Sequence, residues 1–205
     1  MWRSASGLEQ QIEELMDRYT AAGEDHTVRA AVLEEYLRLA YADSDGAGMF
    51  EVYAWTQSLA EDYLALGRVD DAVRVVLEAT RRGDGEGAEL LCELAERLMR
   101  SGHEPTARGL WEHARAGFGQ DVWLYVQAGV EYGDLGDPAT ALTWLTPGID
   151  LALRTGDPES ALEQLVPLRA AALSAVGQAP DDVQARAEHA LARQATSGRA
   201  TGGRR

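Results

Sequence analysis

The amino-acid sequence predicts an all-helical protein built from repeated helix pairs. Helix-forming Ala, Leu, Glu and Arg dominate the composition, and the β-branched runs typical of buried strands are missing. Apolar residues recur at helical spacing along most of the chain, which indicates amphipathic helices. One pattern of small and large residues also returns from Leu59 to Leu94 and from Leu94 to Ala128, at separations of 35 and 34 residues. Such a period is typical of a repeated helix pair.

The N-terminal segment, residues 1–45, is expected to form a helical hairpin. Apolar residues within residues 7–22 fall at helical spacing, and Gly23 ends the pattern. A second helix with a broad apolar face is expected over residues 27–41. The run from Asp43 to Gly48 is rich in Asp, Ser and Gly and then breaks the chain.

Three copies of a seven-position pattern occupy the middle of the chain. The first copy consists of Leu59, Ala60, Tyr63, Gly67, Ala72, Val76 and Ala79. The second consists of Leu94, Ala95, Leu98, Gly102, Ala107, Trp111 and Ala114, and the third of Ala128, Gly129, Tyr132, Gly136, Ala141, Leu145 and Gly148. These residues resemble the tetratricopeptide repeat (TPR) family, in which small residues lie where two helices touch and a large one fills the gap between them. The resemblance implies a right-handed superhelix of antiparallel helix pairs, a TPR-like solenoid, with three pairs over residues 49–154.

A shorter repeat follows, because Gly136-Asp137-Pro138 is echoed twenty residues later by Gly156-Asp157-Pro158. In each copy Gly can end one helix in a left-handed conformation, Asp can cap the next helix, and Pro fits its first position. We therefore expect one helix to begin at Pro138 and another at Pro158.

The remaining C-terminal residues are expected to close the array. Residues 157–195 should form capping helices, the last of them over residues 180–195, and residues 196–205, rich in Gly and Arg, are predicted to be a disordered tail. The chain would then be a single domain over residues 1–195, since its 205 residues are enough to bury about 70% of the unfolded surface in one core.

The C-terminal region also resembles helical regions of actinobacterial proteins that carry a cysteine-rich zinc motif of the SEC-C type. The similarity lies in Leu168-Arg169, Leu173, Gly177 and Pro180-Asp181-Asp182. No such zinc motif is present in the sequence, so the resemblance implies no metal site here.

The charge and the missing residue types limit the possible functions. A formal net charge of -15 disfavours nucleic acid and anionic membranes as partners and favours a basic or apolar peptide. All nineteen basic side chains are Arg, so lysine-dependent chemistry is excluded. Cys92 is the single cysteine, which excludes an intramolecular disulfide and a cysteine-rich zinc site. The N-terminus lacks the apolar run of a signal peptide, so we expect a cytoplasmic protein.

Candidate catalytic or metal-binding residues do not cluster in the sequence. The histidines His26, His103, His113 and His189 are scattered without the spacing of a metal site, and Cys92 has no neighbouring His to activate it. The acidic pairs Asp70-Asp71 and Asp181-Asp182 stand at expected helix starts, where carboxylates cap amides. We therefore expect no enzyme, no metal and no cofactor.

The TPR resemblance also implies a partner-binding site, namely a concave groove lined by the first helix of each pair. The residues that map onto it are Gln57, Glu61, Cys92, Glu96, Arg100, Trp123, Val126, Val130 and Asp134. Trp123 is the candidate anchor, although the apolar members could equally be packed by the next pair. We interpret the chain as a non-enzymatic scaffold or adaptor that holds a protein segment in an acidic groove. The alternative is a peptide- or ligand-sensing module that acts on a separate effector.

Overall fold

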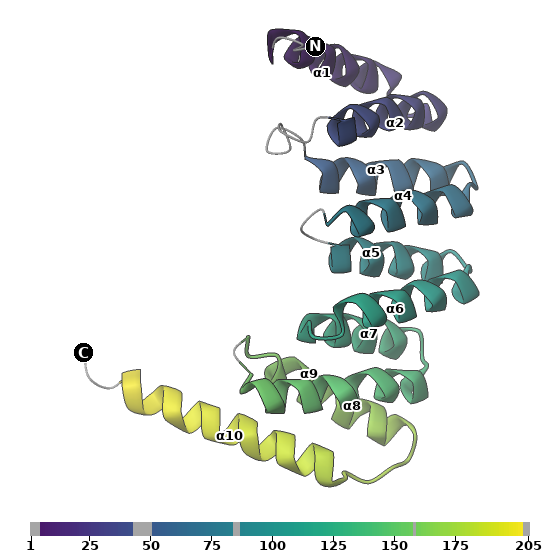
Figure 1. The fold of residues 1–205 in the computed structure, drawn as a ribbon. Helices are drawn as coiled ribbons and strands as arrows, with labels where there is room; N and C mark the ends of the chain where they lie inside the picture. The colour runs from purple at the N-terminus through teal and green to yellow at the C-terminus, as the bar shows by residue number, and fades with distance from the viewer. Residues whose placement is uncertain (1–4, 43–50, 84–86, 158, 203–205) are drawn as a thin grey trace. The chain divides into compact units, whose positions relative to one another are not determined.

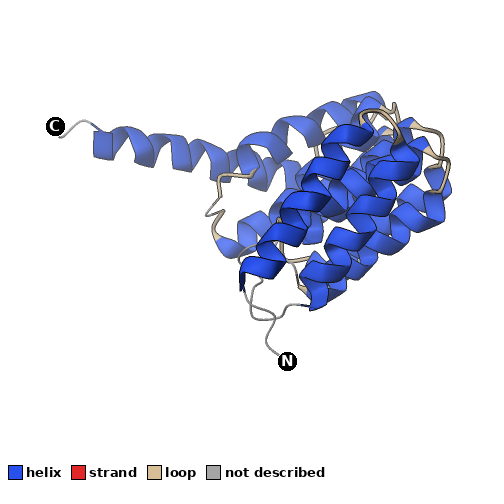
Figure 2. Ribbon diagram, turned by 90° about the horizontal axis from the view of Figure 1, so that it is seen from above, coloured by secondary structure: helices blue, strands red, loops and turns tan. Residues whose placement is uncertain are grey.

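The computed structural model describes residues 5–42, 51–83, 87–157 and 159–202, and over these residues the protein is helical without a strand (Figure 2). The all-helical prediction is therefore confirmed. The helices are α1 (Ala5–Ala22), α2 (His26–Ala42), α3 (Val52–Ala65), α4 (Val69–Arg82), α5 (Gly87–Arg100), α6 (Glu104–Phe118), α7 (Val122–Asp134), α8 (Pro138–Thr155), α9 (Leu162–Ala175) and α10 (Asp182–Gly202). The two N-terminal helices match the expected hairpin closely. The predicted break from Asp43 to Gly48 lies outside the described residues.

The chain divides into two compact units, residues 1–110 (unit 1) and residues 111–205 (unit 2), and the boundary falls within α6. In unit 1 each of the helices α1 to α5 packs against the next (Figure 1). In unit 2, α8 packs against α7, α9 and α10, and α7 also contacts α9. The expectation of a single domain over residues 1–195 stays a prediction.

The three copies of the sequence pattern form the same turn between two helices. Gly67, Gly102 and Gly136 all adopt a left-handed conformation, with φ angles of 71°, 82° and 73°. In each case the amide after the glycine donates to the carbonyl five residues earlier, Arg68 to Tyr63 at 2.8 Å, His103 to Leu98 at 2.8 Å and Asp137 to Tyr132 at 2.9 Å. This is the Schellman arrangement that satisfies the last carbonyls of a helix. A common local structure thus joins α3 to α4, α5 to α6 and α7 to α8.

The small residues of the pattern are buried, as the sequence predicted. Ala72, Ala107 and Ala141 are at most 1% exposed. Gly148 on α8 lies so close to α7 that an added Cβ would stand 2.6 Å from Cβ of Tyr125. These positions therefore depend on side-chain size rather than on apolar character alone.

Aromatic residues fill the interior of unit 2. Trp111 and Trp144 are 0% and 2% exposed, and their rings meet edge to face with centroids 5.9 Å apart. Tyr125 packs against the same Trp144 ring, and the Arg115 guanidinium lies 4.6 Å above it. Trp111 thus fills the space between helices, as expected for the large residue of the repeat pattern.

The two Gly-Asp-Pro copies differ in structure. At the first, the Asp137 carboxylate accepts the Thr140 amide at 3.1 Å and α8 begins at Pro138, as expected. At the second, α9 begins at Leu162 and not at Pro158. Asp157 adopts a left-handed φ of 52°, directly after the left-handed Gly156, whereas a capping residue normally has an extended backbone. Its carboxylate accepts the more distant Leu162 amide at 3.3 Å instead.

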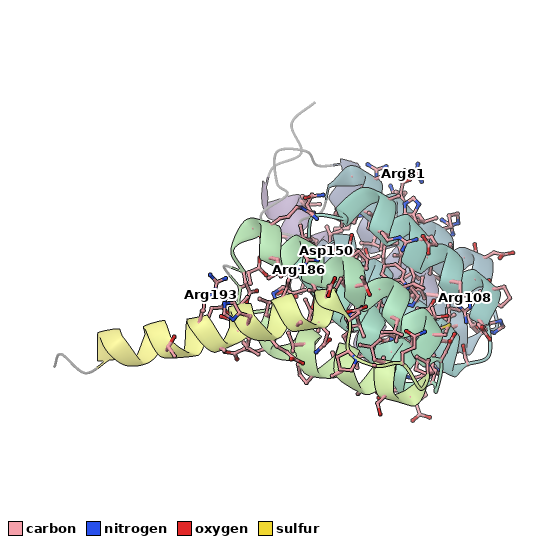
Figure 3. The ribbon with its side chains drawn as sticks, turned by 90° about the horizontal axis from the view of Figure 1, so that it is seen from below. Arg81, Arg108, Asp150, Arg186 and Arg193 are labelled. Carbon is pink, nitrogen blue, oxygen red and sulfur yellow. The ribbon has the colours of Figure 1, made fainter. Side chains whose placement is uncertain are left out.

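Arg169 joins three helices of unit 2. This residue of α9 is 3% exposed, and its guanidinium donates two bonds to Asp181, at 2.9 Å and 2.7 Å. It also donates to the Thr146 hydroxyl of α8 at 3.0 Å. The buried Gln184 of α10 donates to the Val166 carbonyl of α9 at 3.2 Å. Arg186 and Asp150 add an exposed pair between α10 and α8 at 3.3 Å (Figure 3).

The C-terminal helix is longer than the sequence analysis expected. The prediction ended this helix near residue 195, whereas α10 continues to Gly202. The predicted disorder of residues 196–205 stays a prediction. Figures 1 and 2 show the C-terminal end of α10 extending beyond α8 and α9.

The close approach of α7 and α8 yields a first prediction. Gly148→Ala should lower the free energy of unfolding by about 1 to 3 kcal/mol, because Tyr125 cannot move its Cβ without moving α7. Gly133→Ala is the control: nothing lies within 4 Å of its added Cβ, so it should stabilise the helix by about 0.5 to 1 kcal/mol. Urea unfolding of both variants measures the difference. Equal effects of the two substitutions would contradict the close helix contact.

A second prediction concerns Asp181, which is held charged by Arg169. The pKa of the Asp181 carboxyl lies far below its usual value. The hydrogen bond from Arg169 is the largest cause, and the hydrogen bond from the Gln184 amide is the second. The folded state is therefore stabilised at pH values above the ordinary Asp pKa, about 3.9, and this contribution is lost as pH falls toward the lowered pKa. Asp181→Asn should destabilise the protein at pH 7 by about 1 to 3 kcal/mol, since Arg169 loses its charged partner.

The measurement is urea unfolding between pH 7 and pH 3, and the difference between Asp181→Asn and the unchanged protein should shrink toward the acidic end. Asp182→Asn serves as the control because it removes the adjacent charge and leaves the Arg169 bonds in place. A difference that stays constant over the whole pH range would show that the Asp181 charge is not involved.

Candidate functional site

In unit 1, two predicted groove residues on α3 lie beside two charged residues on α5, the first helix of the next pair. Gln57 and Glu61 stand one turn apart on α3, and Glu93 and Arg97 stand one turn apart on α5. The four line a small hollow, here called the α3–α5 surface, with Leu90 and Leu94 among its apolar walls. Arg97 and Glu61 form an ion pair at 2.5 Å, with both side chains about two-fifths exposed (44% and 38%).

Glu93 is the unusual member of the α3–α5 surface. Its Oε2 atom is buried and has no hydrogen-bond partner among the described residues. Burial raises the pKa of Glu93, a hydrogen bond to Tyr53 opposes the rise, and the nearby Glu89 and Glu61 carboxylates add to it. A buried carboxylate oxygen without a donor is unfavourable. A cation or hydrogen-bond donor that reached this oxygen would therefore be bound favourably.

The residues of α5 that were predicted to line the groove lie along a different line of the helix from Glu93 and Arg97. Cys92 is 1% exposed, so it belongs to the core, whereas Glu96 is half-buried and pairs with the exposed Arg100 at 3.3 Å. The pattern identified residues in equivalent positions on successive helices. The side chains that meet in the crevice between α3 and α5 are one residue further along α5, which is why Glu93 and Arg97 were missed.

In unit 2 the predicted groove residues follow one side of α7. Asp121 caps this helix by accepting the Trp123 amide at 2.9 Å, which fixes the start of α7 beside the tryptophan. Trp123 is half-buried, Val130 is 37% exposed and Asp134 is exposed. Val126 is only 3% exposed and therefore packs in the core, as the alternative allowed for the apolar members. A partner can therefore reach the side chains of Trp123, Val130 and Asp134 on α7.

A buried ionic cluster in unit 1 was not found from the sequence. Asp62 of α3 is 1% exposed, with His26 Nδ1 2.8 Å and Arg29 Nε 3.2 Å from its Oδ1 atom. Arg29 also donates to the Tyr19 hydroxyl at 2.5 Å, so the cluster connects α1, α2 and α3. The partners are 36 residues apart in the chain. The one sequence signal that could have indicated this cluster is an acidic residue between the apolar Leu59, Ala60 and Tyr63.

Among the described residues, no group of three or more His, Cys, Asp or Glu side chains is placed to hold a metal ion. None of the described helices combines the length and the apolar character needed to cross a membrane. In comparisons with known proteins, no family model, no curated protein and no solved structure matches this chain.

The Asp62 cluster yields a third prediction. Asp62→Asn should cost about 3 to 5 kcal/mol of unfolding free energy, because the substitution leaves Arg29 without its buried counter-charge. His26→Gln should cost less than about 1 kcal/mol, since the His26 side chain is 41% exposed and water can replace the bond. Urea denaturation gives both values. A small effect of both substitutions would mean that the cluster does not hold α2 against α3.

Proposed function

We propose that this protein is a non-enzymatic adaptor of TPR-like helix pairs, stacked as a right-handed superhelix, which binds a basic segment of another protein along the first helices of its pairs. The observation that carries the proposal is the buried Oε2 atom of Glu93, which lacks a donor on the α3–α5 surface. The three equivalent Schellman turns support the repeat character, since each repeats the same helix-to-helix connection.

The chemistry of the α3–α5 surface favours a cationic side chain from the partner. Glu61 and Glu93 provide two carboxylates, while Arg97 neutralises only one charge, and the chain as a whole carries a net charge of -15. A Lys or Arg side chain beside Glu93 would stabilise its charged form and oppose the rise in pKa that burial causes. Partner binding should therefore strengthen as pH rises through the raised pKa of Glu93.

The α7 side of unit 2 offers the apolar contact that such a segment also needs. Trp123 keeps part of its ring accessible, and Val130 is an exposed apolar residue two turns further on. Partly exposed tryptophans are the side chains most often found to dominate binding energy at protein interfaces. An apolar side chain of a partner would therefore find a contact on this side of α7.

The test begins with affinity purification from the native cell and identification of a stoichiometric protein partner. Glu93→Gln should then weaken the association, mainly through faster dissociation, and remove its pH dependence, because it removes the buried charge that the partner's cation would pair with. Glu104→Gln is the matched control, since it removes the same charge from the exposed start of a second helix, α6. Trp123→Ala should mainly accelerate dissociation, by about tenfold or more, through loss of a buried anchor.

All variants must keep the melting curve of the unchanged protein for the comparison to count. If Glu93→Gln and Glu104→Gln affect association equally, the charge acts over a distance and the α3–α5 surface is not the site. If Trp123→Ala and Glu93→Gln both leave partner binding unchanged, the first helices do not bind the partner and the adaptor model fails in this form.

A further inference from the structure

A pocket of ≈ 580 Å³ lies in unit 1 between α2 and α4, on the α2 side of α3. Both helices pack against α3 (Figure 1). The Leu59 side chain of α3 lines the space between them. The α2 wall carries Leu37, Arg38 and Tyr41, which lie within about one turn of one another. Arg74, Val75 and Arg82 form the α4 wall. We call this space the α2–α4 pocket; its volume lies within the range of small-molecule sites, roughly 300 to 1,000 Å³.

The inner surface of the α2–α4 pocket is apolar. Leu37, Leu59 and Val75 are 5%, 1% and 8% exposed, so they belong to the hydrophobic core and present only their outer atoms to the pocket. The Tyr41 ring closes one end, with the Arg82 guanidinium 4.2 Å above its centroid. An apolar group in this pocket would be shielded from water on several sides.

The rim of the pocket carries charges of both signs, and one of its arginines, Arg38, has no salt-bridge partner among the described residues. Three arginines and two glutamates line the pocket, whereas the net charge of the protein is -15. Arg82 is paired with Glu78 at 2.7 Å, and Arg74 with Asp71 at 3.0 Å. The other acidic residue of the lining, Glu34, accepts a hydrogen bond from the buried Tyr63 hydroxyl. Arg38 is exposed and makes no salt bridge to any described residue.

We propose that the α2–α4 pocket binds a small organic anion, a carboxylate or phosphate attached to an apolar body. The anionic group would lie at Arg38, with Arg74 on the opposite wall, and the apolar body would contact Leu37, Leu59 and Val75. Arginine suits this role because its planar guanidinium donates two parallel hydrogen bonds to a carboxylate or phosphate. The site differs from the α3–α5 surface and does not depend on the adaptor function.

The experiment uses two fluorescent probes that share the same rings. One is 1-anilinonaphthalene-8-sulfonate, which is an anion, and the other is N-phenyl-1-naphthylamine, which has no charge. The full chain should bind the anionic probe at one site and the neutral probe much more weakly. Arg38→Gln should weaken binding of the anionic probe about tenfold, which corresponds to one charged hydrogen bond, and leave the neutral probe unchanged. Octanoate and octyl phosphate compete for the same site, and their relative potency tells which headgroup the pocket prefers.

Arg81→Gln is the matched control. Arg81 of α4, labelled in Figure 3, is 67% exposed and pairs with Glu78. It is not one of the residues that line the pocket. The substitution should leave the affinity for the anionic probe within about twofold of the original, since the lost charge is exposed and Glu78 stays paired with Arg82. The proposal is overturned if the unchanged protein fails to bind the anionic probe, if both probes bind equally, or if Arg81→Gln weakens binding as much as Arg38→Gln. Circular dichroism melting must show that both variants fold like the unchanged protein.

Discussion

The hydrogen bond that spans the left-handed glycines Gly67, Gly102 and Gly136 is the interaction on which the rest of the fold depends. When the amide after Gly67 or Gly136 donates to a carbonyl five residues earlier, the first helix ends at a fixed point and the next begins at a fixed angle. That angle decides which faces of the two helices meet. Small residues such as Ala72 and Ala141 are then required at the point of closest approach, and larger ones such as Tyr63 and Tyr132 fill the space beside it.

This local control explains why much of the fold can be predicted from the sequence. Helix periodicity, the positive-φ glycines and the buried alanines depend on residues that are close together in the chain, so the pattern of residues 59–79 is sufficient to recognise the turn at Gly67. The Asp157 exception is instructive, because the same three residues, Gly-Asp-Pro, give a different helix start when Asp157 accepts the Leu162 amide and the Gln194 side chain. Gln194 is 37 residues away from Asp157 in the chain.

The candidate site was less predictable for a related physical reason. Equivalent residues on repeated helices share a position relative to their own helix, and the sequence pattern identifies them well. Contacts between neighbouring helices involve residues that are not equivalent, such as Glu61 with Arg97. The environment of Glu93, which combines burial, an unmatched oxygen and nearby carboxylates, depends on several helices at once and has no signature in a single segment.

The use of arginine connects the stability of the units with their candidate functions. Arg169 and Arg29 are largely buried and hold helices together through Asp181 and Asp62, so their charges are matched within the fold. Because lysine is missing from the sequence, arginine must supply every other basic contact as well. Arg38 lies beside apolar core atoms and has no acidic partner among the described residues. It therefore does not hold helices together as Arg169 and Arg29 do. Its position is more readily understood if its counter-charge comes from outside the chain, as the counter-charge of Glu93 would at the α3–α5 surface.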